Sequence, residues 1–73
     1  MNTYYELVSM FYDNGKLTII INEIRADEKP KDNYYRLNHY TFREYFYDLQ
    51  SAKNRQNKLL KANNQYYDCY CEK

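Results

Sequence analysis

The position of the chain's only glycine is the feature that most constrains the fold. Gly15 ends an Asp-Asn-Gly stretch, 13–15, which separates two segments, 3–12 and 16–26, that are rich in β-branched and aromatic residues. Asn-Gly favours a type I′ turn, because both central residues of that turn need positive φ angles. The pattern therefore predicts a β-hairpin whose two strands are these segments.

Alternation along the second strand assigns its apolar residues to two faces of a sheet. One face carries Leu17, Ile19 and Ile21, and the other carries Ile20 and Ile24.

A third antiparallel strand is predicted over residues 40–47. On one face of this segment lie Tyr40, Phe42 and Phe46, interrupted by Glu44. The opposite face holds Arg43, Tyr45 and Tyr47.

A helix is predicted over residues 49–63, and either Asp48 or Ser51 could cap its N-terminus. On a helical wheel one arc about 100° wide forms an apolar stripe. This stripe contains Leu49, Ala52, Gln56, Leu59 and Leu60. Asn63 and Asn64 are a plausible stop, because Asn tolerates the left-handed αL conformation.

The remaining segments complete one α+β domain, residues 1–73. Residues 27–33 contain the only proline and predict a loop, whereas 34–40 are ambiguous. Residues 65–73 could form a fourth strand or a tail. The predicted architecture is a small antiparallel β-meander of three to four strands with one helix packed on it. Its predicted core includes Leu7, Ile19, Ile21, Phe42, Phe46, Leu59 and Leu60.

No motif of an enzyme, metal or nucleotide site is present. Cys69 and Cys71 form a C-x-C pair that could touch one metal, but a structural zinc site needs four ligands, and the only histidine is His39. A disulfide between these cysteines would close a very tight ring, so two reduced thiols are expected. His39 lacks a recognisable nucleophile partner. We therefore predict no catalytic activity and no cofactor.

Size and hydropathy point to function on an outer surface in the cytoplasm. A chain of 73 residues buries only about 60–65% of the surface of its unfolded form, which leaves little room for an internal cavity. No apolar run approaches the roughly 20 residues of a membrane span, and the N-terminus lacks a signal-peptide pattern. The chain has 11 tyrosines, more than a small core can absorb, and tyrosine is enriched at binding hot spots.

Charge segregation in the predicted helix suggests a partner-binding surface. Segment 49–63 contains four bases and no acid, although the formal net charge of the chain is only +1. Such a face could contact phosphates or an acidic protein surface, and a solvated helix face is the plainer alternative. The predicted partner-binding residues are Lys53, Arg55, Lys58 and Lys61, with Tyr45 and Tyr47 on the preceding strand.

The segments FYDNGKLTIIINEIRADEKPKDNYY, 11–35, and YTFREYFYDLQSA, 40–52, carry a resemblance to a known type of protein. They resemble short uncharacterised proteins of phages and mobile elements of low-GC Gram-positive bacteria, over roughly residues 4–62. The shared features are a Tyr-rich hairpin with a D-N-G-K turn, an E-K-P loop, an aromatic third strand and a helix after an F/Y-D pair. This chain differs in its basic helix, in Gln56 and in its Tyr/Cys tail.

The resemblance implies a protein that binds and blocks a host protein, as anti-CRISPR and other anti-defence inhibitors do. The expected partner is a host protein, such as a defence protein that itself grips nucleic acid. The alternative is a nucleic-acid-binding accessory protein that uses the basic helix. A homodimer is also left open, and no contact with a membrane is expected.

Overall fold

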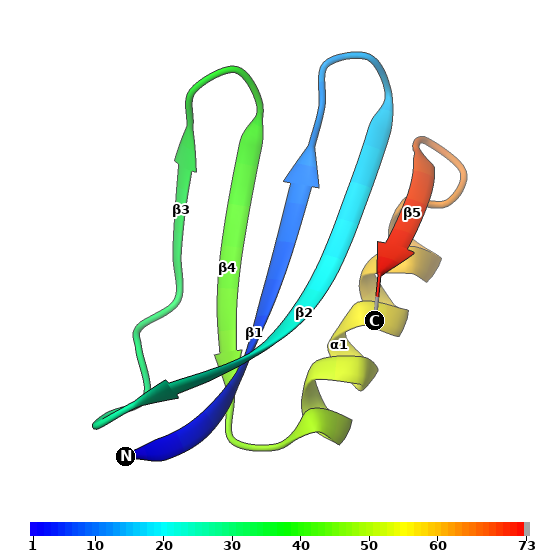
Figure 1. Ribbon diagram of the computed structural model, residues 1–73. Helices are drawn as coiled ribbons and strands as arrows, with labels where there is room; N and C mark the ends of the chain where they lie inside the picture. Colours follow the sequence, from blue (N-terminus) through cyan, green and yellow to red (C-terminus); the bar gives the residue numbers. More distant parts are fainter. Residues whose placement is uncertain (73) are drawn as a thin grey trace.

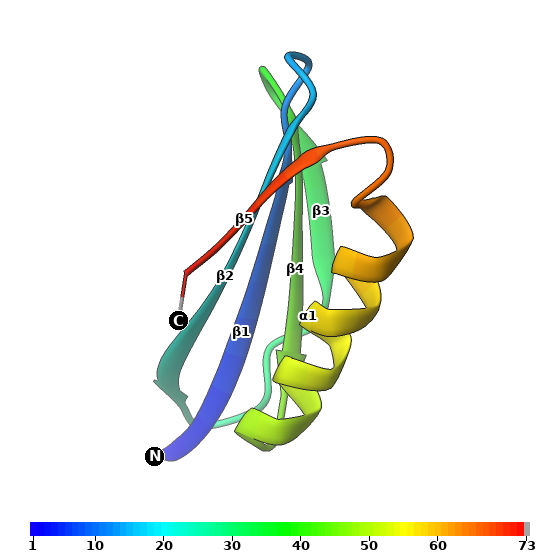
Figure 2. The same cartoon turned by 90° about the vertical axis from the view of Figure 1, so that its right-hand side faces the viewer.

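The computed structural model describes residues 1–72, which form two layers: a five-stranded sheet and one helix on one of its faces (Figures 1 and 2). The elements are β1 (Asn2–Phe11), β2 (Lys16–Ala26), β3 (Asn33–Arg36), β4 (Tyr40–Phe46), α1 (Leu49–Asn63) and β5 (Asp68–Glu72). The predicted α+β class is confirmed. The predicted tail reached residue 73, which lies outside the described residues.

The hairpin is present, but its turn differs from the prediction. Gly15, with φ 85°, is the only residue with a positive φ among those described, so the type I′ assignment is wrong. The N–H of Gly15 donates to the carbonyl of Tyr12 at 3.2 Å, and the N–H of Tyr12 donates to the carbonyl of Lys16 at 2.9 Å. These bonds define a three-residue loop, in which only the last residue needs the αL conformation.

The strand order also differs from the predicted meander. The sheet runs β3-β4-β1-β2-β5, with β5 parallel to β2 and all other neighbours antiparallel. Tyr4, Leu7 and Val8 show why β1 is central, because they are buried although they point to opposite faces. Every residue of β3 is exposed, as suits an edge strand. The loop 27–32 therefore carries the chain from β2 across to the opposite edge.

The helix begins and ends where the sequence predicts. Asp48 is the N-cap, and its carboxylate accepts the N–H of Ser51 at 2.8 Å. Asn64 ends the helix with φ −64°, so the expected αL conformation is wrong. The chain instead leaves through a tight turn, in which the N–H groups of Tyr66 and Tyr67 both donate to the carbonyl of Asn63 at 2.9 Å.

The core lies between α1 and the centre of the sheet. Leu7, Leu17 and Ile19 are fully buried. Packed against them are Phe11, Ile21, Phe46, Leu59, Leu60, Tyr67 and Cys69. Leu17 was absent from the predicted core. Phe42, which was included, is 36% exposed, because α1 does not cover its part of the sheet.

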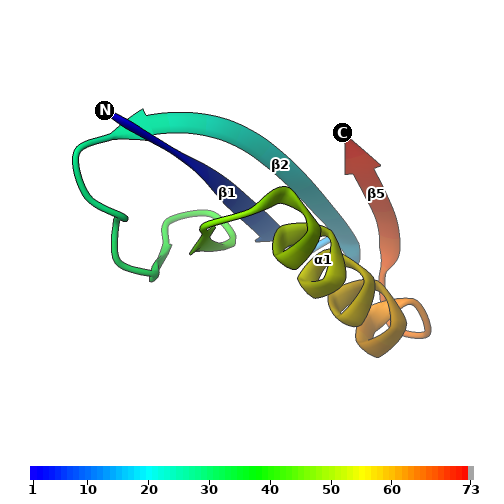
Figure 3. The ribbon, with the colours of Figure 1, turned by 90° about the horizontal axis from the view of Figure 1, so that it is seen from below.

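α1 covers only part of its face of the sheet. In Figure 1 it lies toward β2 and β5, and Figure 3 shows it beside β1 and β2 from below. At the centre of this face Leu7, Leu17 and Ile19 are buried, whereas the side chains of β3 and of the start of β4 on the same face are exposed. No helix among residues 1–72 is long and apolar enough to span a membrane.

Candidate functional site

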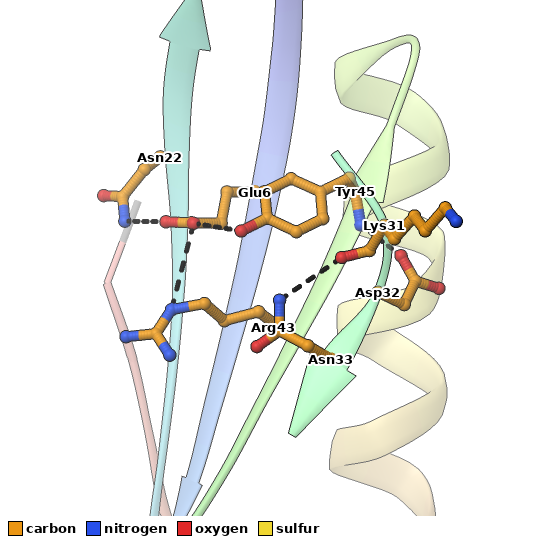
Figure 4. Close-up of polar contacts among 7 residues, drawn as sticks. All are labelled: Glu6, Asn22, Lys31, Asp32, Asn33, Arg43 and Tyr45. Atoms are coloured by element: carbon orange, nitrogen blue, oxygen red, sulfur yellow. Dashed lines mark hydrogen bonds and ion pairs between the residues drawn. The ribbon is translucent and has the colours of Figure 1, made fainter. Parts of the chain in front are cut away.

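Tyr45, one of the predicted partner-binding residues, points away from α1. Its hydroxyl donates to Glu6 Oε2 at 2.8 Å, and Asn22 Nδ2 donates to Glu6 Oε1 at 3.2 Å (Figure 4). Arg43 Nε lies 3.9 Å from Glu6 Oε2. These four residues, the Glu6 network, come from β1, β2 and β4 on the open face of the sheet. Partial burial and the hydrogen bond to Glu6 both raise the pKa of the Tyr45 phenol.

The backbone of Tyr45 also holds the loop that leads to β3. Its N–H donates to Asp32 Oδ1 at 2.9 Å, and its carbonyl accepts Lys29 Nζ at 3.3 Å. At the start of β3, Asn33 Nδ2 donates to the Lys31 carbonyl at 3.2 Å (Figure 4). Tyr45 therefore has a structural role, in which its polar groups are already engaged.

Tyr47 is more accessible. Its side chain is 73% exposed. Its ring meets Tyr4 edge-on at a centroid distance of 5.8 Å, and Lys29 Nζ lies 5.5 Å from its centroid. Tyr4 lies on the open face, because it is two residues from Glu6 along β1. Tyr47 packs on Tyr4 and so belongs to the same face. It is therefore separated from α1 by the sheet.

The four bases of α1 do not form one surface with these tyrosines. Arg55 Nε donates to both oxygens of Glu44, at 3.2 and 3.0 Å, and so ties α1 to β4. This pair explains the carboxylate within the apolar face of β4. Lys58 lies on the same side of α1, beside Phe46. Lys53 lies on the other side, near Ile21 of β2, and Lys61 is exposed.

A cluster of stacked aromatic rings occupies the part of the sheet that α1 leaves open. The ring of Phe42 stacks on Tyr34, at 5.5 Å and 19°, and on Tyr40, at 6.4 Å and 24°. Phe11 meets Phe42 edge-on at 5.6 Å and joins the cluster to the core. Tyr34 is 67% exposed, Tyr40 43% and Phe42 36%. We call Tyr34, Tyr40 and Phe42 the aromatic shelf.

A groove of about 410 Å³ separates the aromatic shelf from α1. Its lining includes Ser9, Phe11, Phe42, Glu44, Arg55 and Leu59. Ser9 is 1% exposed, and its Oγ has no hydrogen-bond partner within residues 1–71. An unpaired buried hydroxyl is costly, and this small side chain lies beneath the groove.

Sequence reasoning missed this site because it placed Phe42 in the core. Alternation showed correctly that Tyr40 and Phe42 share the face that α1 packs on. It could not show how far α1 extends over that face. One signal was available, since a single helix about 10–12 Å wide covers only two or three strands spaced about 4.8 Å apart.

The chain's two cysteines and its histidine do not assemble into a reactive site. Cys69 is half-buried, Cys71 is exposed, and both thiols are free. Burial raises the pKa of both, with smaller effects from Asp68 on Cys69 and from Cys69 on Cys71. This shift favours the less reactive thiol form. His39 stacks on Tyr12 at 4.3 Å.

Among the side chains that the structure describes, those of residues 1–71, no group of three or more His, Cys, Asp or Glu is arranged to hold a metal ion. Comparison with protein-family models, curated proteins and solved structures gave no match.

Proposed function

We propose that this chain is a protein-binding domain whose partner docks on the aromatic shelf. The observation that carries this proposal is the exposure of three stacked aromatic rings beside a groove. Contiguous exposed apolar surface commonly marks an interaction site. Binding hot spots are enriched in tyrosine, and buried aromatic anchors dominate their energy.

Such a domain would inhibit its partner by covering part of the partner's surface. The shelf is well suited to this role, because Phe11 connects Phe42 to the core. The aromatic rings of the shelf are therefore already held in place, and little side-chain entropy is lost when a partner binds. The resemblance to small phage-borne proteins supports a host protein in the cytoplasm as the partner, with anti-CRISPR or other anti-defence inhibition as the expected outcome. In this proposal the chain is not an enzyme.

Nucleic-acid binding is the second candidate, and the unpaired bases of α1 favour it. Of the ion pairs among the described side chains, residues 1–71, none includes Lys53, Lys58 or Lys61. Exposed tyrosines can stack on bases in a single strand. The separation of Lys53 from Lys58 on opposite sides of α1 weakens this candidate, since a backbone track needs adjacent charges.

Affinity capture from a bacterial lysate tests the proposed function. The Tyr34→Ala/Tyr40→Ala double variant removes the two more exposed rings of the shelf, and both sites tolerate change because they contribute little to the core. Tyr70→Ala is the matched control, since Tyr70 is 60% exposed on β5, at the opposite edge of the sheet. A partner should be captured by the wild type and by the control and lost with the double variant. Equal capture by all three would refute the shelf assignment.

A charge variant in the same assay separates the two candidate functions. Lys53→Glu and Lys61→Glu are combined. Arg55 is left intact because reversing it would place two carboxylates together at Glu44, and Lys58 is left intact because it lies beside Arg55, on the side of α1 that faces the shelf. A nucleic-acid ligand should be lost with this variant, and its affinity for the wild type should fall log-linearly with rising salt. A protein partner held by the shelf should be retained under the same conditions.

A further inference from the structure

The uncovered strip of the sheet beside α1 is about one helix wide. β3 and the first half of β4, residues 40–42, together occupy about 10 Å at the usual strand spacing, and a helix with its side chains is about 10–12 Å across. The second half of β4 lies under α1, because Phe46 packs on the core and Glu44 holds Arg55. Under α1, Leu7 and Leu17 are fully buried, whereas Tyr34 and Tyr40 on the strip are exposed. The two-layer architecture therefore has room for one more helix next to α1.

The strip has a floor and one wall of the kind that holds a helix. The floor is the aromatic shelf, and the wall is the side of α1 that presents Arg55 and Leu59 to the groove. A ridge of apolar side chains on a second helix could enter this groove. The groove, about 410 Å³ in volume, has room for one large side chain. An extended segment would instead pair with the outer edge of β3, away from the groove.

The charges around the strip favour an acidic occupant. Of the acids that line the groove, Glu44 is paired with Arg55, whereas Asp32 accepts the N–H of Tyr45 and keeps its negative charge. Lys58 on the α1 wall takes part in no ion pair with the side chains of residues 1–71. Arg36 lies on the α1-facing side of β3, and its guanidinium carbon is 5.1 Å from the Tyr40 ring centroid. Its acidic partner is Asp13, and the distance from Arg36 Nη2 to Asp13 Oδ2 is long, at 3.9 Å.

We propose that the aromatic shelf and the groove bind an amphipathic α-helix of the partner. The helix lies along α1 and inserts a large apolar side chain into the groove above Ser9. Acidic residues on its flanks face Lys58 and Arg36. This inference rests on the proposed function and adds the secondary structure and the charge of the segment that is recognised.

Selection from a displayed library of random 18-residue peptides tests the proposal with the full chain. Peptides are selected on the wild type and counter-selected on the Tyr34→Ala/Tyr40→Ala variant, whose folding is checked by circular dichroism. Enriched peptides should carry large apolar residues at i, i+3 or i+4, and i+7, with acidic flanks, and should gain helical circular dichroism when bound. Ser9→Val, which fills the floor of the groove, should weaken binding by about tenfold or more, as the loss of a hot-spot contact does.

Two control variants test the charge and the location of binding. Lys58→Glu should weaken the selected peptides, and Tyr70→Ala should leave their affinity unchanged. Shelf-dependent peptides that bind in extended form or carry basic flanks would overturn this inference and leave the proposed function standing. Recovery of no shelf-dependent peptide would also overturn it, and the lysate capture would then decide the proposed function separately.

Discussion

Replacing Ser9 should stabilise the free protein. Its hydroxyl is buried in β1 without a hydrogen-bond partner within residues 1–71, and burial of such a group costs about 1–3 kcal/mol. Ser9→Ala removes that cost and a small amount of packing, so the free energy of unfolding should rise by about 0.5–1 kcal/mol. Ser9→Val adds two methyl groups, each worth up to about 0.8 kcal/mol when buried, and it also suits a strand.

The expected total for Ser9→Val is therefore a gain of about 1–2 kcal/mol. Urea denaturation of the wild type and both variants measures these differences directly. The slope of unfolding free energy with urea should stay constant, because the surface exposed on unfolding hardly changes. The melting temperature should rise by about 4–8 °C per kcal/mol in a domain of this size.

The pattern across the two variants separates the parts of the reasoning. A loss of more than about 1 kcal/mol in Ser9→Ala would show that the hydroxyl makes a hydrogen bond. A gain in Ser9→Ala with a loss in Ser9→Val would show that the floor of the groove has no room for methyl groups. Stabilisation by Ser9→Val together with loss of partner binding would identify the groove as a site kept open for function.

Three further perturbations test the fold. Gly15→Ala should lower the free energy of unfolding, measured by urea denaturation, by about 1–2 kcal/mol, because Gly15 has φ 85°. No atom lies within 4 Å of an added Cβ, so this loss comes from backbone conformation alone. A negligible loss would contradict the αL conformation of Gly15. A double-mutant cycle with Glu44→Gln and Arg55→Met should give a coupling free energy of about 0.5–1 kcal/mol, since the ion pair is partly exposed. If the two stability losses simply add, the ion pair does not hold α1 to β4. The hydrogen bond from the Ser51 side chain, and to a smaller extent the one from its backbone, lowers the pKa of the Asp48 carboxyl. The contribution of the Asp48 carboxylate to folding stability is therefore complete above the ordinary pKa of aspartate, and it is lost as pH falls through the lowered pKa. Stability of the wild type should then fall more steeply in acid than that of Asp48→Asn, whereas parallel curves would rule out this linkage.

The sequence by itself determined the elements that depend on neighbouring residues. The Asp-Asn-Gly stretch placed the first hairpin, and β2 begins at Lys16 and ends at Ala26 as predicted. Asp48 and the apolar stripe defined α1 from Leu49 to Asn63. These signals are local, because a turn, a cap and a helical period each involve residues within a few positions of one another.

Only the tertiary structure decided how the strands pair. β3 has four residues, all exposed, so burial imposes no alternation that sequence patterns could reveal. β5 joins β2 in parallel through contacts between distant segments, beginning where the N–H of Asp68 donates to the Gly15 carbonyl at 2.8 Å. Strand order depends on which segments meet in space, and the pattern within a strand does not record its neighbours.

The candidate site follows the same division. Alternation assigned Phe42 to the face that packs on α1 and Tyr45 to the opposite face, and both assignments agree with the strand register. The sequence could not show that α1 stops short of Phe42 or that Glu6 engages Tyr45. A side chain's face is determined by the geometry of its own strand, whereas its burial depends on what other elements cover that face.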